Sequence, residues 1–111
     1  MNYLHKDLAN GKWESLTFLQ QMANIGSEVE RTINWRSKGN KEYSLKASER
    51  ALELFDLTIK QQKTYPKILE LVRARELFVD YIFGNNIYQS TDKEWQNYFI
   101  NFTCAAIIDK K

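Results

Sequence analysis

Apolar residues recur along most of this chain three or four positions apart, which is the spacing of an α-helix rather than the alternation of a β-strand. Gly39, Pro66 and Gly84 interrupt this pattern, and glycine and proline favour the ends of helices over their interiors. The pattern therefore predicts four helices, with the first longer than the rest. Their expected ranges are about 12–38, 41–62, 66–83 and 91–109.

Residues at the expected boundaries support this division. Pro66 suits the first turn of a helix because its φ angle is already fixed near the helical value, and Thr91 with Glu94 has the spacing of a capping box. The connections are short, which favours antiparallel neighbours. We therefore expect an all-α fold with one domain over residues 1–111, an antiparallel up-and-down four-helix bundle.

Two features of the first expected helix go beyond a simple apolar face. Gly26 lies in its middle, where glycine costs about 1 kcal/mol relative to alanine, so we expect a second helix to approach closely there. Phe18, Ile25 and Trp35 add a large apolar area away from the main core arc, which a solvated face does not need. The sequence predicts a contact with a second copy or a protein partner through Phe18, Ile25 and Trp35.

Composition and charge narrow the classes of function. The chain has 111 residues, 43% of them hydrophobic, which is enough for one core. Its 16 basic and 14 acidic side chains leave a net charge of +2, too little to coat nucleic acid. No apolar run approaches the roughly 20 residues that span a bilayer, and the first residues do not look like a secretory signal. We expect a cytoplasmic protein without a membrane partner, in which the single cysteine, Cys104, fills a small space in the core.

Basic residues gather around the expected turn at Gly39. Acidic residues are interleaved with them, so the local excess is only about two charges. Two interpretations stay open: a solvated turn, or an accessory protein that binds nucleic acid through salt-sensitive contacts to phosphates. The residues that would make these contacts are Arg31, Arg36, Lys38, Lys41 and Arg50.

Arg75 is the basic residue that most needs an explanation, because apolar residues surround its position on the third expected helix. A buried guanidinium requires a carboxylate partner, and Glu28 and Asp56 are the nearest candidates. The spacing does not choose between them. It also does not distinguish a structural ion pair from a site that binds an anion through the planar guanidinium.

The chain lacks the usual catalytic motifs. There is no glycine-rich phosphate loop and no cysteine pair for zinc, and the single histidine, His5, lies before the first expected helix. We therefore predict no catalytic residues, no metal site and no cofactor.

One acidic cluster leaves an enzymatic alternative open. Glu49, Glu53 and Asp56 share one face of the second expected helix, and Glu53 with Asp56 is similar to half of the magnesium site of all-helical nucleotide pyrophosphohydrolases. The other half would be a Glu-x-x-Glu motif on the preceding helix, where this chain has Glu28 and Arg31. A solvated acidic face explains the same residues, so a magnesium-dependent nucleotide hydrolase is kept only as an alternative.

Four stretches together resemble a family of short bacterial four-helix proteins without a characterised function. They comprise residues 24–31 (NIGSEVER), 35–40 (WRSKGN), 48–59 (SERALELFDLTI) and 80–88 (DYIFGNNIY). The resemblance implies the fold but no site residues. The expected shape is also similar to small helical-bundle accessory proteins that assemble into rings or accompany nucleic-acid enzymes. The sequence thus favours a non-enzymatic interaction or accessory protein that associates with itself.

Overall fold

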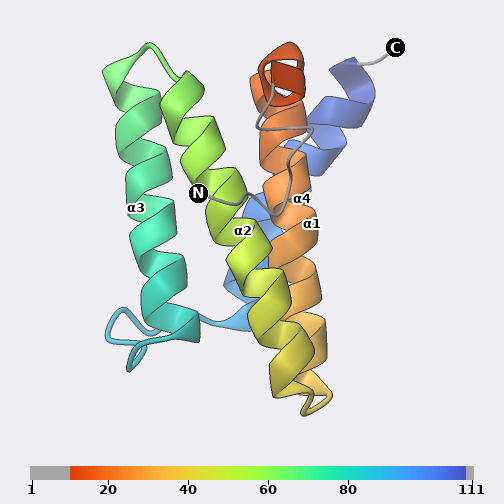
Figure 1. Cartoon of the computed structure of the whole chain (residues 1–111), viewed down its shortest axis with the longest axis vertical. Helices are drawn as coiled ribbons and strands as arrows, with labels where there is room; N and C mark the ends of the chain where they lie inside the picture. Colours follow the sequence, from red (N-terminus) through yellow and green to blue (C-terminus); the bar gives the residue numbers. More distant parts are fainter. Residues whose placement is uncertain (1–10, 110–111) are drawn as a thin grey trace.

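The computed structural model describes residues 11–109, and these form only helices, turns and irregular segments. A short 3-10 helix precedes four α-helices, and successive helices run in opposite directions in Figure 1. The helix α1 packs along both α2 and α4, and α2 also packs against α3, whereas the backbones of α3 and α4 hardly approach each other. The all-α fold of four helices is confirmed. Their bounds are η2 (Trp13–Ser15), α1 (Phe18–Ser37), α2 (Lys41–Gln61), α3 (Tyr65–Ile82) and α4 (Asp92–Asp109).

Both ends of α2, α3 and α4, and the C-terminal end of α1, lie within one residue of the predicted boundaries. Gly39 has a φ of 79°, a left-handed conformation that glycine adopts without strain, and Asn40 then caps α2 by accepting a hydrogen bond from the Tyr43 amide. Pro66 lies in the first turn of α3. Thr91 accepts a hydrogen bond from the Glu94 amide at 3.2 Å, which satisfies an amide of the first turn of α4.

The first helix begins later than the sequence predicted. Its boundary is set by a capping box, in which the Thr17 hydroxyl accepts from the Gln20 amide and the Gln20 side chain accepts from the Thr17 amide. Before this cap, Trp13 is buried and its indole Nε1 donates a 3.0 Å hydrogen bond to Thr58 on α2. With 20 residues, α1 is therefore no longer than α2, which has 21.

The core runs between the four helices, and α4 approaches α1 closely at Gly26. A Cβ atom on Gly26 would lie only 2.8 Å from Cβ of Phe99, so any larger residue would push α4 away. The expected close approach of a second helix at Gly26 is thus confirmed. Residues from each helix fill the rest of the core, among them Met22, Val29, Phe55, Leu71, Phe78 and Trp95.

The turn between α3 and α4 is organised by Asp80. Its carboxylate accepts hydrogen bonds from the amides of Ile87 and Tyr88, at 2.9 and 3.2 Å. Asn86, with a φ of 51°, exchanges two further hydrogen bonds with the Ser90 backbone. These contacts bring the start of α4 back beside the end of α3. None of the described helices is long and apolar enough to cross a membrane.

Candidate functional site

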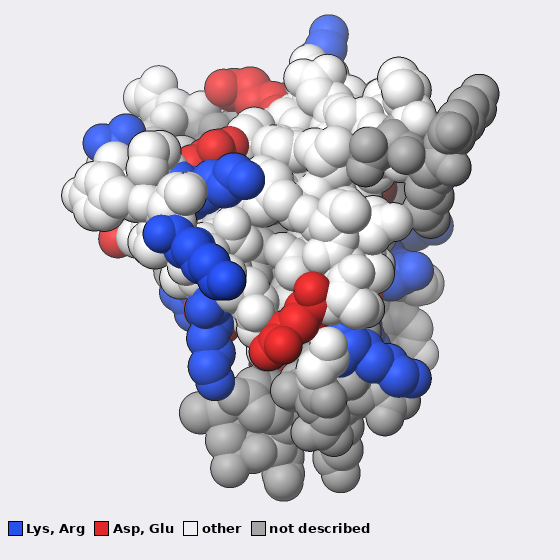
Figure 2. Space-filling view, turned by 90° about the horizontal axis from the view of Figure 1, so that it is seen from above, with Lys and Arg blue, Asp and Glu red and all other residues white. Residues whose placement is uncertain are grey.

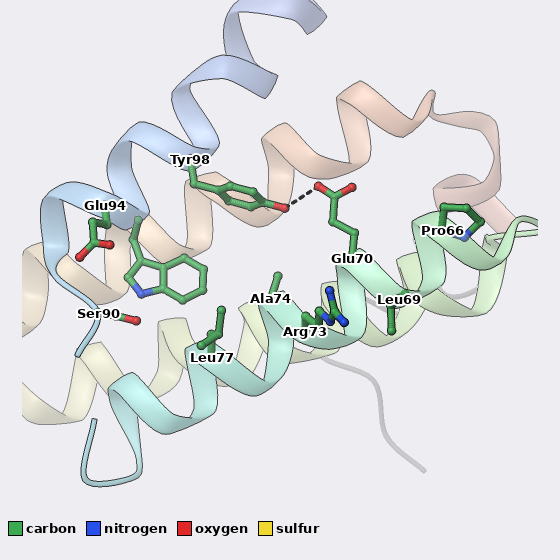
Figure 3. A pocket seen from close by; sticks show the side chains of 10 residues that line it. Pro66, Leu69, Glu70, Arg73, Ala74, Leu77, Ser90, Glu94 and Tyr98 are labelled. Carbon is green, nitrogen blue, oxygen red and sulfur yellow. Dashed lines mark hydrogen bonds between the residues drawn. The ribbon is translucent and has the colours of Figure 1, made fainter. Parts of the chain in front are cut away.

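A groove of about 500 Å³ lies between α3 and α4. It follows from the packing, because these two helices do not close against each other as the other neighbouring helices do. Figure 3 shows side chains from both helices converging on the space between them. Most of the lining is apolar, from Pro66, Leu69, Ala74 and Leu77 on α3 and from Trp95 and Tyr98 on α4.

The rim of the groove is polar and carries both signs of charge. Glu70 and Arg73 lie on α3, Glu94 lies in the first turn of α4, and Ser90 lies just before that helix. The Tyr98 hydroxyl donates a 2.9 Å hydrogen bond to the Glu70 carboxylate, the dashed line in Figure 3, and so joins the two walls. Burial raises the pKa of the Tyr98 phenol, and the hydrogen bond and negative charge of Glu70 raise it further. Tyr98 therefore acts here as a neutral hydrogen-bond donor.

Trp95 explains why the groove stays open at the end nearer the turn. Its ring centroid lies 5.7 Å from that of Phe78 and 6.4 Å from that of Tyr81, so an indole fills the space between α4 and α3. The Trp95 indole keeps the backbones of α3 and α4 so far apart that the smaller side chains farther along the groove do not meet. The Trp95 Nε1 atom is buried without a hydrogen-bond partner among the described residues.

The outer face of α4 is the second apolar surface. Ile100 and Ile107 are 57% and 58% exposed, Ile108 is 70% exposed, and Cys104 is exposed rather than in the core as the sequence predicted. The correction has a simple cause: Cys104 lies about 180° around the helix from Trp95, and no other described helix covers that side. No residue between Glu94 and Asp109 carries a formal charge. This uncharged stretch is the feature of the sequence that indicates the exposed apolar face.

The end of the molecule that carries the C-terminal half of α4 has little charge at its centre. Figure 2, which looks down on this end, shows a continuous area of uncharged atoms bordered by basic and acidic side chains. An apolar helix face next to such a surface is typical of a contact with another protein.

The structure does not bring the predicted contact residues of the first helix together. Ile25 is fully buried in the core instead of facing outward, because α2 and α4 both pack on α1 and Ile25 lies on the side that they cover. Phe18 is half-buried, with its ring centroid 6.2 Å from that of Phe102. Trp35 is half-buried at the other end of α1, where its ring meets Tyr43 at 4.9 Å.

Arg75 pairs with Asp56. Its Nε donates to Asp56 Oδ1 at 2.7 Å and its Nη2 to Oδ2 at 3.3 Å, which joins α3 to α2 in a two-pronged contact. The Arg75 side chain is 34% and the Asp56 side chain 59% exposed, so the guanidinium lies at the rim of the core. The pairing with Asp56 uses the Nε and Nη2 donors that would otherwise bind an anion.

Glu28 belongs to a different cluster. Its side chain is only 8% exposed, and its carboxylate is hydrogen-bonded to Arg31 and lies 3.9 Å from the Arg50 guanidinium. Two cations from α1 and α2 therefore compensate one buried carboxylate. This contact explains why an acidic residue is tolerated on the buried side of α1.

Most of the residues predicted to bind nucleic acid already contact other side chains of this chain. Arg31 and Arg50 face Glu28, as described above. The Arg36 guanidinium lies 4.8 Å from the Tyr81 ring and the Lys38 ammonium 5.3 Å from the Trp35 ring, distances at which a cation is attracted to an aromatic face. Lys41 is exposed at the start of α2. A basic side chain that already contacts a carboxylate or an aromatic ring is less available to bind a phosphate.

The acidic face of α2 has no metal-binding arrangement among the residues that the structure describes. No three histidine, cysteine or carboxylate side chains of residues 11–109 come together as metal ligands, and Asp56 is already paired with Arg75. His5 lies outside the described residues. No family model, curated protein or solved structure matches the chain, so its own residues carry the functional inference.

Proposed function

We propose that the protein is a non-enzymatic interaction protein of the cytoplasm that associates with copies of itself. The fold that we propose for it is an antiparallel up-and-down four-helix bundle with one side open between α3 and α4. The observation that carries the proposal is the outer face of α4, where isoleucines more than half exposed lie on a stretch of helix without formal charge. Leaving this area in water costs about 25 cal/mol per Å², which association recovers.

Self-association explains the outer face of α4 better than solvation does. An exposed helix usually presents charged side chains to water, and α2 does so with Lys46 and Glu49 on its exposed side. The outer face of α4 instead combines isoleucines with small polar residues such as Thr103. Between Glu94 and Asp109 this face presents no formal charge to a charged partner, and its isoleucines suit an apolar surface of another chain. The predicted contact on α1 is replaced in this proposal by the contact on α4.

The molar mass of the protein in solution tests the proposal. Sedimentation or light scattering at micromolar concentrations is expected to give a mass above the 13.2 kDa of one chain. The double variant Ile100→Glu with Ile107→Glu is expected to be a monomer, because two buried charges oppose the contact. Leu45→Glu is the matched control, since Leu45 is also about half exposed but lies on α2. A wild-type chain that stays monomeric throughout this range contradicts the proposal.

The two alternatives from the sequence have their own tests. A nucleic-acid accessory protein would bind RNA or DNA at low salt and lose this binding steeply as salt rises. Of the predicted contact residues, Lys41 is the one for which no contact with a ring or a carboxylate is described above. A magnesium-dependent nucleotide hydrolase would turn over nucleotides only with magnesium or manganese. The absence of a gel shift, or of turnover, removes each alternative in turn.

A further inference from the structure

The outer face of α4 contains three residues that lie seven positions apart: Lys93, Ile100 and Ile107, called here the α4 stripe. Seven residues are about two turns, so the three side chains follow one line along the helix. All three are exposed, and Lys93 makes no ion pair with a described residue. The α4 stripe therefore consists of one available cation followed by two apolar side chains, which a rise of about 1.5 Å per residue places ~10 Å apart.

The groove between α3 and α4 fits this stripe in length and chemistry. It extends along α3 from Pro66 to Leu77, which corresponds to about 16 Å of helix and accommodates both isoleucines. Its lining is mostly apolar, and its rim carries two carboxylates, Glu70 on α3 and Glu94 on α4, against one cation, Arg73. An incoming helix would meet apolar surface with its isoleucines and a carboxylate with its lysine.

The positions of the stripe and the groove on α4 dictate how two copies can meet. Tyr98 lines the groove, and Ile107 follows it by nine residues, which is about 180° around the helix. The stripe of a chain therefore faces away from the groove of the same chain. Two copies cannot insert their stripes into each other's grooves in one symmetric contact, so each contact must be head-to-tail.

We propose that a second copy of this chain occupies the groove, with its α4 stripe lying between α3 and α4 of the first. This inference rests on the proposed self-association and specifies its geometry. Each copy then receives one neighbour in its groove and inserts its stripe into another. Such contacts build assemblies larger than a dimer, which grow with concentration or close into a ring.

Two complementary variants test this geometry in the full chain. The stripe variant carries Ile100→Glu and Ile107→Glu and keeps its groove intact. The groove variant carries Leu69→Glu and keeps its stripe intact. Leu69 lines the groove but does not belong to the core cluster, so its replacement places no charge inside the core. Leu45→Glu is again the control. Circular dichroism verifies that each variant is helical before its mass is measured.

Head-to-tail contact has a distinctive result when the variants are mixed. Each variant alone is expected to associate about tenfold more weakly or worse than wild type. An equal mixture is expected to form a complex of one stripe variant and one groove variant. It should stop at two chains, because the remaining stripe and the remaining groove are both blocked.

Three other results would contradict the proposed contact. If the groove variant associates as well as wild type, the head-to-tail contact is wrong, while the proposed self-association stands and a symmetric contact between two α4 faces takes its place. If the mixture stays monomeric, the groove is likewise not the partner of the stripe. If wild type itself is monomeric, self-association fails as a whole.

Chemical cross-linking gives an independent measurement should Leu69→Glu fail to fold. Cys104 is the only cysteine and lies beside the α4 stripe, so a short bifunctional maleimide reports whether two such residues meet. In the Arg73→Cys variant, the Cys104 thiol of one copy and the introduced thiol in the groove of the next should give a ladder beyond the dimer. Wild type treated in the same way should give none. Cross-linking of wild type through Cys104 to a dimer alone would overturn the head-to-tail contact.

Discussion

The Tyr98 hydroxyl donates a hydrogen bond of 2.9 Å to the Glu70 carboxylate, and this contact joins the two helices whose backbones hardly approach each other. The aromatic contacts of Trp95 with Phe78 and Tyr81 join the same two helices nearer the turn. Two contacts therefore fix the width of the groove: the hydrogen bond between Tyr98 and Glu70 and, nearer the turn, the aromatic packing of Trp95.

Replacing Tyr98 by phenylalanine should loosen the groove without emptying the core. The ring remains, but the bond to Glu70 is lost, so we expect the free energy of unfolding to fall by about 1 kcal/mol. Denaturation by urea measures the change. Tyr65→Phe serves as the control, because the Tyr65 side chain is 72% exposed, and it should leave the stability unchanged. An equal effect of both variants would show that the bond does not hold the groove.

The same hydrogen bond predicts a loss of stability in alkali. The pKa of Tyr98 is raised in the folded chain above the ordinary tyrosine value of 10.0, so near and above that pH the folded state holds its proton more tightly than the unfolded state. Stability from this group is complete below about pH 10 and falls as the pH rises further. We expect the difference in unfolding free energy between wild type and Tyr98→Phe to shrink in this range. A difference that stays constant from neutral pH to above pH 10 contradicts the assignment.

Gly26→Ala should destabilise the protein although alanine favours helices. The better helix propensity contributes up to about 1 kcal/mol, but the new Cβ would lie 2.8 Å from Cβ of Phe99, and overpacking of this kind costs about 1–3 kcal/mol. We expect a net loss in the free energy of unfolding. Ser27→Ala, on the exposed neighbouring position, is the control and should change stability little. A gain for Gly26→Ala would mean that α4 moves aside easily.

The Arg75–Asp56 pair should contribute modestly to stability. Both side chains are substantially exposed, and exposed ion pairs contribute about 0.2–1 kcal/mol. A double-mutant cycle with Arg75→Gln and Asp56→Asn measures the coupling, which we expect to fall as salt is added. A coupling that is absent, with Arg75→Gln instead abolishing binding of a phosphate compound, would favour the anion site over the structural pair.

Helix number and most helix ends can be predicted because they depend on local chemistry. Gly39 and Pro66 act within a turn or two of their own positions, so the periodicity on either side is sufficient. The sequence predicts too early a start for α1 because Lys12 to Leu16 continue a helical pattern. The capping box at Thr17, together with the burial of Trp13 against Thr58, interrupts it.

The candidate site cannot be predicted in the same way because it depends on the distance between helices. The sequence predicts Ile25 on the surface, whereas it is buried because both α2 and α4 cover α1. The groove exists because Trp95 separates α4 from α3, and no spacing along the chain reveals that separation. The two isoleucines of the α4 stripe, by contrast, have a sequence signal, because no residue between Glu94 and Asp109 carries a formal charge.

The three tryptophans of the chain provide fluorescent reporters at three separate places. Trp13 is buried and hydrogen-bonded to α2, Trp35 is half-buried beside the first turn, and Trp95 lines the groove. Chains that retain one tryptophan at a time would therefore report on each of these places separately. Only the spectrum of Trp95 should change when the groove is filled, so its emission can follow occupancy in real time without an added label.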